Sequence, residues 1–237
     1  MIDRLGPTQR PQEPVWGYQN WRKLLFLHWQ VPLEALRPLV PDALTLDVHD
    51  GVAYVGVVPF VMRDIRPRWW PAAAAFNFLE TNVRTYVHLD GQPGVYFFSL
   101  EASSRLAVLA ARYGWGLPYH YARMDIQEQE GAIHYESVRA TGPRHAASYR
   151  IGEPLGPSEP GSLEFFLLER YLLFVSRYQQ LYVGQVHHTP YPAQQVELLD
   201  VHDELIQAAG LDQPAGDPCC AHYAAGVDVD IFALKPV

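Results

Sequence analysis

Lysine is scarce in this sequence: of eighteen basic residues among 237, only Lys23 and Lys235 are lysines. Any chemistry that needs an amine nucleophile therefore has two candidates, one near each end of the chain. Cysteine is equally rare, because Cys219 and Cys220 are the only two. Adjacent cysteines do not easily reach disulfide geometry, so no disulfide framework is expected and we interpret both as small residues in a packed segment.

Several other absences exclude classes of partner. The net charge is -8, the pI is near 5.6, and no cluster of basic residues is interleaved with aromatic ones, which argues against nucleic acid as a partner. No apolar run approaches the ~20 residues that span a bilayer, and the N-terminal residues lack the apolar core of a signal peptide. We therefore expect a cytoplasmic protein with no membrane partner.

Motifs for nucleotides, metals and serine hydrolysis are also missing. The sequence contains no GxGxxG, no P-loop and no GxSxG elbow. His187 and His188 are adjacent, and neighbours on a strand point to opposite faces, so they do not readily share one ion. We expect one of them to be buried and hydrogen-bonded. No cofactor or metal is predicted.

Composition and length favour one large globular domain. Apolar residues make up 49% of the chain, aromatic residues 13% and charged residues 19%, which is neither a disordered composition nor that of a coiled coil. Residues 1–14 hold three prolines and no apolar periodicity, and they predict a flexible N-terminal arm. Residues 15–237 are expected to form a single domain, because no linker or internal repeat divides them.

Short apolar runs between turn residues indicate a β-rich fold. The Asp50-Gly51 pair between two apolar runs predicts a hairpin with a tight turn, and residues 76–89 and 95–102 predict a second hairpin across DGQPG. Helical spacing over residues 103–114 predicts a helix that ends at Gly114. Further strands are expected at residues 21–31, 119–128, 132–140, 145–151, 181–191 and 226–237.

Two more helical segments complete the prediction. Ser162 can cap a short helix that runs into a strand, and residues 201–210 look helical, with Gly210 as the stop and with His202 and Asp203 on a solvated surface. About ten strands with three or four helices, and no repeating βα unit, give a mainly β fold with peripheral helices. A large, mostly antiparallel β barrel is the natural closure, because it removes exposed edges.

One strand carries a row of polar side chains. Alternate residues share a face of a strand, so Glu80, Asn82, Arg84, Tyr86 and His88 line up opposite an aliphatic face. This row faces either solvent, as charged faces of antiparallel sheets usually do, or the interior of a barrel. The aromatic residues of the FNF segment just upstream belong to the same face and favour a pocket wall.

Five segments of the sequence carry a resemblance to a known family: LLFLHWQVPLEALRPLVPDALTLDVHDGVAYVGVVPF, FLETNVRTYV, ARYGWGLPYHYARM, GSLEFFLLERYLLF and VGQVHHTPY. Together they resemble the acetoacetate decarboxylase-like superfamily, and within it the YqjF-like, DUF2071-type branch. The resemblance covers nearly the whole chain from about Trp16. Members of that superfamily fold as a large β barrel with peripheral helices and need no cofactor, so the resemblance implies the same fold for this chain.

The same resemblance implies a changed active site. In the decarboxylases the segment after the helix ends in Pro-Lys-Lys, and the first lysine forms a Schiff base with the keto acid. Here WGLPYH places Tyr119 at that lysine and His120 at its neighbour, and a phenol cannot form an imine. Glu80 resembles the active-site glutamate, whereas the family's arginine before the early helix is replaced, with Gln30 nearest to it.

These observations support three functional hypotheses. The first is a protein that binds a small apolar or aromatic carbonyl or phenolic compound in its central cavity without Schiff-base decarboxylation. The second is a lyase, hydratase or isomerase without imine chemistry, in which Glu80 and Tyr119 transfer protons. The third is a structural or interaction protein. The candidate ligand-binding residues are Arg84, Asn82, Tyr86, His120, His28 and Gln30. By family analogy, Tyr119 faces the cavity and His120 faces the packing behind the sheet.

Overall fold

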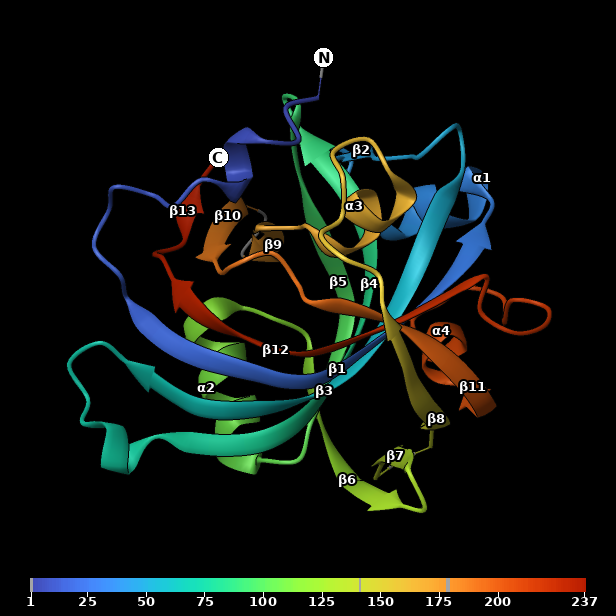
Figure 1. Ribbon diagram of the computed structural model, residues 1–237. Coiled ribbons are helices and arrows are strands. Elements are labelled where there is room, and N and C mark those ends of the chain that lie inside the picture. The colour runs from blue at the N-terminus through green and yellow to red at the C-terminus, as the bar shows by residue number, and fades with distance from the viewer. Residues whose placement is uncertain (1, 141, 178–179) are drawn as a thin grey trace.

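The computed structural model describes residues 2–140, 142–177 and 180–237, and most of its regular structure is β (Figure 1). Thirteen strands of these residues form one sheet. They are β1 Gly17–Val31, β2 Thr45–Leu46, β3 Ala53–Pro67, β4 Phe76–Leu89, β5 Gln92–Ala102, β6 Tyr119–Gln129, β7 Ala132–Arg139, β8 Arg144–Pro154, β9 Leu172–Arg177, β10 Gln180–His187, β11 Ala193–Asp203, β12 Cys220–Ile231 and β13 Lys235–Pro236.

Short helices cover the ends and edges of this sheet. They are α1 Leu33–Leu36, α2 Arg105–Trp115, α3 Leu163–Leu168 and α4 Leu205–Ala208, with 3-10 turns at Gly6–Thr8, Arg37–Leu39 and Ala72–Ala74. Ser162 caps α3 as predicted, because its side chain accepts a hydrogen bond from the amide of Phe165. The helix predicted over residues 103–114 is α2, which starts at a Ser104 cap. The predicted stop at Gly114 is wrong, because the helix continues to Trp115 and Gly116, in the left-handed region, is its C-cap.

The sheet closes on itself. Its order is β13-β10-β9-β5-β6-β7-β8-β11-β12-β1-β3-β4-β2, and the additional pairings β4–β5 and β10–β12 join strands that are distant in this order. One closed ring runs β5-β6-β7-β8-β11-β12-β1-β3-β4 and back to β5. A second ring uses β9 and β10 instead of β6, β7, β8 and β11. All pairings are antiparallel except β5–β6 and β5–β9, so the predicted mostly antiparallel sheet is confirmed.

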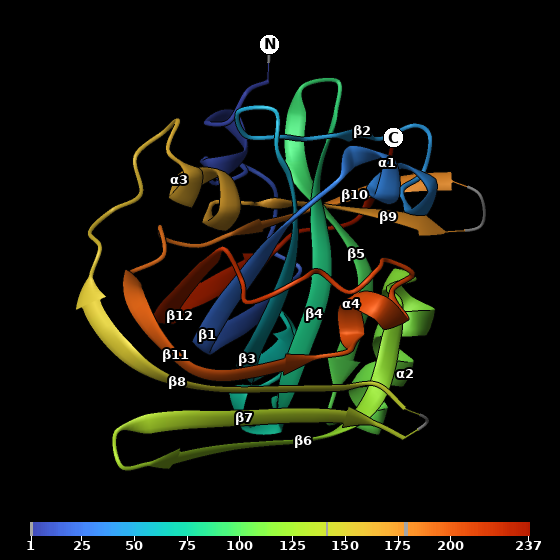
Figure 2. The ribbon, with the colours of Figure 1, turned by 90° about the vertical axis from the view of Figure 1, so that its right-hand side faces the viewer.

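Both rings share β12, β1, β3, β4 and β5, and this shared wall separates two hydrophobic cores. The α3-side core includes Phe26, Tyr86 and Phe166, and the α4-side core includes Leu27, Val83 and Ile206. Consecutive residues of β1, β3 and β4 are therefore buried on both faces, which explains why these strands read as continuous apolar runs. In Figure 2, β6, β7 and β8 lie side by side on the α4 side of the molecule.

Two predicted turns have the expected backbone. Asp50 and Gly51 have φ of 50° and 80°, and Asp90 and Gly91 have φ of 49° and 81°, values that suit the tight turns of hairpins. The second turn joins β4 directly to β5. The first closes only one bridge, His49 to Val52, because β2 instead pairs with β4. The predicted first hairpin is therefore wrong beyond its turn.

The predicted helix at residues 201–210 is also partly wrong. Residues Ala193–Asp203 form β11, which the sequence did not indicate, and only Leu205–Ala208 are helical. The apolar pattern of the segment VHDEL is compatible with both a helix and a strand. Pairing with β8 stabilises the strand. Asp203 is consequently buried instead of lying on a solvated surface.

The N-terminal residues, which we expect to form a flexible arm, contact the sheet in this structure. Arg4 pairs with the buried Asp47, and Arg10 pairs with Asp230. Their flexibility in solution stays a prediction, as does the assignment of residues 15–237 to a single domain, which the single sheet supports. None of the helices described here is long and apolar enough to cross a membrane.

Candidate functional site

The polar face of β4 points into the protein. Relative exposure is 3% for Glu80, 5% for Asn82, 8% for Arg84 and 0% for Tyr86. Tyr86 belongs to the α3-side core, which therefore lies on this face of the strand. Of the two alternatives that the sequence left open, solvent and interior, the structure selects the interior.

Glu80 and Tyr119 form the central contact of this face. The Tyr119 hydroxyl donates to Glu80 Oε2 at 2.6 Å, and both side chains are buried. The parallel pairing of β5 and β6 places Tyr119 beside Leu100, which in turn pairs with Asn82 on β4. The phenol of Tyr119, which follows the GWGLP turn, thus reaches across β5 to the carboxyl group of Glu80 on β4.

Burial dominates the protonation of this pair. It raises the pKa of Glu80 to about 8, a rise that hydrogen bonds from Tyr119 and Asn82 oppose and that the nearby Glu101 increases. Burial and the adjacent carboxyl raise the pKa of Tyr119 well above its usual value. Near neutral pH the pair therefore holds its protons, and Glu80 is poised to release one.

A second tyrosine supports Glu80 from behind the strand. The Tyr135 hydroxyl donates to the backbone oxygen of Glu80 at 2.8 Å and accepts from Thr81 Oγ1 at 3.1 Å. This contact was not predicted. The alternation of β7 marks Tyr135 as a buried aromatic residue, but only the register of distant strands brings it to Glu80.

The other end of the polar face holds His28, Tyr86 and Arg84. Tyr86 donates from its hydroxyl to the carbonyl of Leu167 at 2.9 Å, so His28 Nε2, at 2.7 Å, donates to Tyr86. Arg84 donates to the same carbonyl at 3.2 Å. Burial lowers the pKa of His28 well below its usual value, followed by the positive charge of Arg84. His28 is therefore neutral, and its Nδ1 has no protein partner among the described residues.

Two predicted site residues lie elsewhere. His120 is half-buried and pairs in register with Glu101, on the opposite face of the sheet from Tyr119. Burial, with Arg139 and Arg112 nearby, lowers the pKa of His120 to about 4. Gln30 is exposed at the end of β1, where it contacts Tyr54. The structure thus brings Glu80, Asn82, Arg84, Tyr86, His28 and Tyr119 together on one interior face, and it does not bring His120 or Gln30 there.

A second buried polar cluster lies on the α4 side of the shared wall. Glu101 is paired with Arg139, whose Nε donates to Glu101 Oε1 at 2.8 Å. His145 Nδ1 lies 2.7 Å from Asp203 Oδ1. Neither pair was predicted, because both join strands that are separated by long segments of sequence. Apart from His120, none of the sequence-predicted site residues lies in this cluster.

Neither lysine faces the interior. Lys23 pairs with Glu128 at 3.0 Å, and Lys235 pairs with Glu13; both lysine side chains are at least 40% exposed. His188, as expected of one of the two adjacent histidines, is buried, and its Nδ1 lies 2.7 Å from the carbonyl of Thr189. Over the part of the chain that the structure describes, no group of three metal-binding side chains is assembled.

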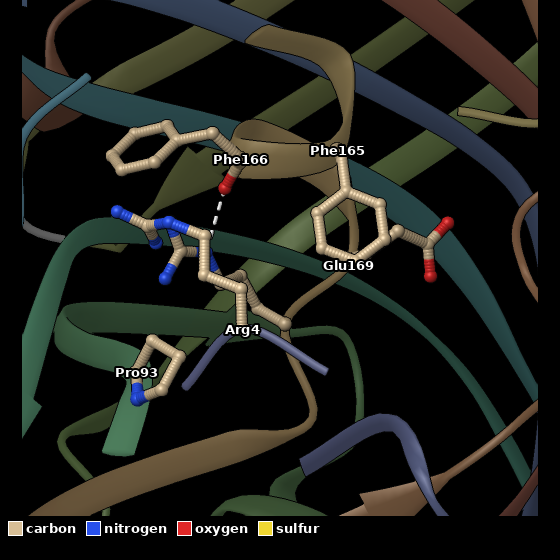
Figure 3. A pocket seen from close by; sticks show the side chains of 6 residues that line it. Arg4, Pro93, Phe165, Phe166 and Glu169 are labelled. Atoms are coloured by element: carbon tan, nitrogen blue, oxygen red, sulfur yellow. Dashed lines mark hydrogen bonds between the residues drawn. The ribbon is translucent and has the colours of Figure 1, made fainter. Parts of the chain in front are cut away.

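A small pocket lies at the outer side of α3 (Figure 3). Its empty space is about 150 Å³, open solvent included, and it is lined by Arg4, Pro93, Phe165, Phe166, Glu169 and Arg170. Arg170 and Arg4 share the carboxylate of Asp47, each at 2.7 Å, and both guanidinium groups lie against the ring of Phe166. None of the predicted site residues lines this pocket.

Helix α2 covers the Glu80 end of the polar face with little buried surface. Val108 is its one fully buried residue, and it packs with Tyr119 and Leu100. Leu106, Leu109 and Tyr113 on the same helix are exposed. Part of the apolar surface of α2 therefore faces solvent.

Comparison with known proteins gives a family and a fold. Residues 18–228 match the family DUF2071, described as "Uncharacterized conserved protein". The chain is 40% identical over 221 residues to the "Uncharacterized protein YqjF" of Bacillus subtilis (strain 168), covering 92% of this chain and 90% of that protein.

Solved structures share the fold at low sequence identity. The enduracididine biosynthesis enzyme MppR, complexed with pyruvate, has a TM-score of 0.67 at 11% identity, with 96% of this chain and 93% of that chain covered. Acetoacetate decarboxylase from Legionella pneumophila has a TM-score of 0.63 at 14% identity, with 98% and 94% covered. At such identities the likeness extends to the fold alone.

Proposed function

The chain belongs to the DUF2071 family, with an acetoacetate decarboxylase-like fold, and from this premise we propose that it binds a small carbonyl or phenolic compound at Glu80 and Tyr119. The observation that carries the proposal is the 2.6 Å hydrogen bond between these two buried groups. The phenol donates its one hydrogen to Glu80, so the protonated carboxyl is the donor that remains for a ligand oxygen.

The proposed binding does not involve an imine. Tyr119 stands where the resemblance to the decarboxylases puts the reactive lysine, and both lysines of this chain lie on the surface in ion pairs. The aromatic walls of the α3-side core, including Phe26 and Phe166, suit a ligand with an apolar or aromatic body.

The test is a titration of the purified protein with benzaldehyde, 4-hydroxybenzaldehyde and phenol, followed by ligand-observed NMR. Glu80→Gln and Tyr119→Phe are each expected to weaken binding about 5- to 10-fold, the effect of losing one hydrogen bond. His120→Gln is the matched control, because His120 lies on the opposite face of the sheet. Equal weakening by all three variants, or by none, would overturn the proposal.

Borohydride reduction in the presence of each aldehyde tests the chemistry. We expect intact-mass spectra of the denatured protein to show the same slow, nonspecific labelling for the wild type and for Lys23→Gln. A stoichiometric adduct on Lys23 or Lys235 would contradict binding without an imine. If none of the compounds binds, the third hypothesis, a structural or interaction role, replaces this one.

A second function is favoured by the pKa of Glu80 near 8. A buried carboxyl that exchanges its proton close to neutral pH suits a general acid or base next to a carbonyl group, with Tyr119 as the donor to the developing oxyanion. This is lyase or isomerase chemistry without an imine. Its test is exchange of hydrogen for deuterium at the carbon beside the carbonyl of propanal in D2O, which Glu80→Gln should abolish.

We also propose that the protein acts in the cytoplasm and does not bind nucleic acid. The net charge of -8 supports the second statement, because a phosphate backbone repels an acidic surface. Salt-dependent retention on a nucleic acid matrix would contradict it.

A further inference from the structure

Arg84 is a buried cation without a counterion. It is 92% buried, by the 8% relative exposure above, and among the described residues no carboxylate lies within ion-pair distance of its guanidinium group. Among the described residues it donates to the carbonyl of Leu167 and interacts with the hydroxyl of Tyr86, while its Nε has no partner. Removing a guanidinium from water without pairing it costs several kcal/mol.

Two other arginines with little exposure are paired with carboxylates. The side chain of Arg170 is 2% exposed and bonds Asp47, and that of Arg139 is 12% exposed and bonds Glu101. The rings of Phe26 and Tyr86, at 5.6 and 5.8 Å from the Arg84 guanidinium carbon, compensate its charge only in part. Arg84 therefore differs from Arg139 and Arg170 because no carboxylate among the described residues pairs with it.

The surroundings of Arg84 leave acceptor atoms free on the same interior face. Gly56 lies between His28 and Arg84 in the register of the sheet. A Cβ at Gly56 would stand 3.1 Å from the ring of His28 and 3.6 Å from Cγ of Arg84, so glycine lets the two side chains converge. His28 Nδ1 and Asn82 Oδ1 have no partner among the described protein atoms.

We propose that the ligand of the Glu80 site is an organic carboxylate whose carboxylate group pairs with Arg84 and whose apolar body extends along β4 to Glu80 and Tyr119. This inference rests on the proposed function and names the class of its ligand. The planar guanidinium fork matches a carboxylate, which supplies the missing negative charge. Four residues of strand separate Glu80 from Arg84, roughly 13 Å at ~3.3 Å per residue, so the ligand needs a body between its polar ends.

The experiment compares two probes of the same shape, 4-formylbenzoate and its neutral amide, 4-formylbenzamide. Isothermal titration with the full chain should give the anion at least about tenfold tighter binding than the amide. Arg84→Met should remove this preference while the amide still binds, and Arg84→Lys should keep part of it. Arg123→Met is the control for net charge, because Arg123 is exposed on β6.

The stability of the free protein provides a second readout. An unpaired buried charge opposes folding, so Arg84→Met should leave the melting temperature unchanged or raise it, and Arg84→Lys keeps the proposal testable if Met perturbs the fold. A purely structural arginine would give the opposite result, a clear fall in melting temperature with no change in the ratio of the two affinities.

The outcomes separate this inference from the function on which it rests. If the amide binds in a way that depends on Glu80 and Tyr119 but the anion binds no tighter, the proposed function stands and Arg84 is not an anion site. If neither probe binds the wild type, this inference fails, and the titrations with benzaldehyde, 4-hydroxybenzaldehyde and phenol decide the proposed function separately. Loss of the anion preference in Arg123→Met as well would also overturn the assignment to Arg84, because it would reduce the effect to net charge.

Discussion

Glu80 and Glu101 lie on neighbouring strands, are both almost fully buried, and yet have opposite environments. Glu101 faces the α4 side, where Arg139 donates two hydrogen bonds to one of its oxygens. Glu80 faces the α3 side, where its partners are a phenol and an amide. A guanidinium compensates a carboxylate charge, whereas neutral donors leave most of the cost of burial in place. The first carboxyl group holds strands together, and the second is available for a proton or a ligand.

The two arginines of the α3-side core repeat this contrast. Arg170 is held by Asp47, and the pair fixes α3 against the N-terminal residues through Arg4. Arg84 has a carbonyl and two aromatic rings but no carboxylate among the described residues. Glu80 and Arg84, two buried groups without a charged partner among the described residues, lie on the same face of β4.

The largest expected effect comes from breaking the compensated pair. Arg139→Met leaves the carboxyl of Glu101 buried without its cation and should lower the free energy of unfolding by about 3–5 kcal/mol. Urea denaturation at pH 7 measures it. The double variant Glu101→Gln with Arg139→Met should recover much of the loss, because no charge is then stranded. A loss below about 1 kcal/mol would show that the pair does not hold these strands.

Replacement of Glu80, the carboxyl group without a charged partner, tests how the free energy of unfolding depends on pH. The folded state keeps a proton on Glu80 up to about pH 8, whereas the unfolded chain releases it near pH 4.5. The stability that this protonation contributes is therefore complete below pH 4.5 and is lost as pH rises through about 8. Between these limits the wild type loses up to about 1.4 kcal/mol per pH unit from this group.

Glu80→Gln should lack this component. Relative to the wild type, the variant should become more stable by about 2 kcal/mol for a rise of two pH units within that window. Parallel urea denaturation curves at several pH values measure the difference. The burial of Glu101 and Glu169 also raises their pKa values, and the subtraction cancels their contribution. Parallel stability profiles for the two proteins would mean that Glu80 is ionised in the fold.

Tyr119→Phe should have a smaller effect of defined direction. The hydrogen bond from Tyr119 lowers the pKa of Glu80, so its removal should raise that pKa further and cost about 1 kcal/mol of stability. Carbon NMR of the labelled Glu80 carboxyl reports the shift. Tyr121→Phe, on the same strand, is the matched control. A fall in the pKa of Glu80 would show that the phenol stabilises the protonated form instead.

The smallest effect is expected at Lys23. Its ion pair with Glu128 is solvent-exposed, so Lys23→Gln should change the free energy of unfolding by less than about 0.5 kcal/mol. The affinity for 4-hydroxybenzaldehyde should also stay the same. Loss of ligand binding in this variant would show that the amine of Lys23 takes part in the site. It would contradict the proposal that the ligand binds at Glu80 and Tyr119 without an imine.

Local sequence pattern was sufficient to locate the polar face but not to place its partners. The two-residue period of β4 put Glu80, Asn82, Arg84 and Tyr86 on one side, and the Phe-Asn-Phe segment indicated the interior. The resemblance added Tyr119 opposite Glu80. His120 and Gln30 were included because the resemblance aligns them with residues of the decarboxylase site. Strand alternation places His120 on the other face of the sheet, and Gln30 lies exposed at the end of β1.

The buried pairs Glu101–Arg139 and His145–Asp203 depend on the register between strands, which no local sequence pattern encodes. Arg139 reaches Glu101 only because β6 lies between β5 and β7, in a parallel pairing that the α2 connection imposes. Asp203 was read as part of an amphipathic helix, although pairing of β11 with β8 extends it as a strand to His145. Tertiary contacts decided both, and intrinsic propensity did not.

The position of β12 in the sheet also has a consequence for the biosynthesis of this protein. This strand, among the last to be made, is inserted between β11 and β1, which is the first, as the red and blue ribbons of Figure 1 show. Neither ring of the sheet can close until β12 has been made. Apolar strands made earlier remain exposed until then, and because the closing contacts join distant segments, folding is slow and the nascent chain is open to aggregation in the meantime.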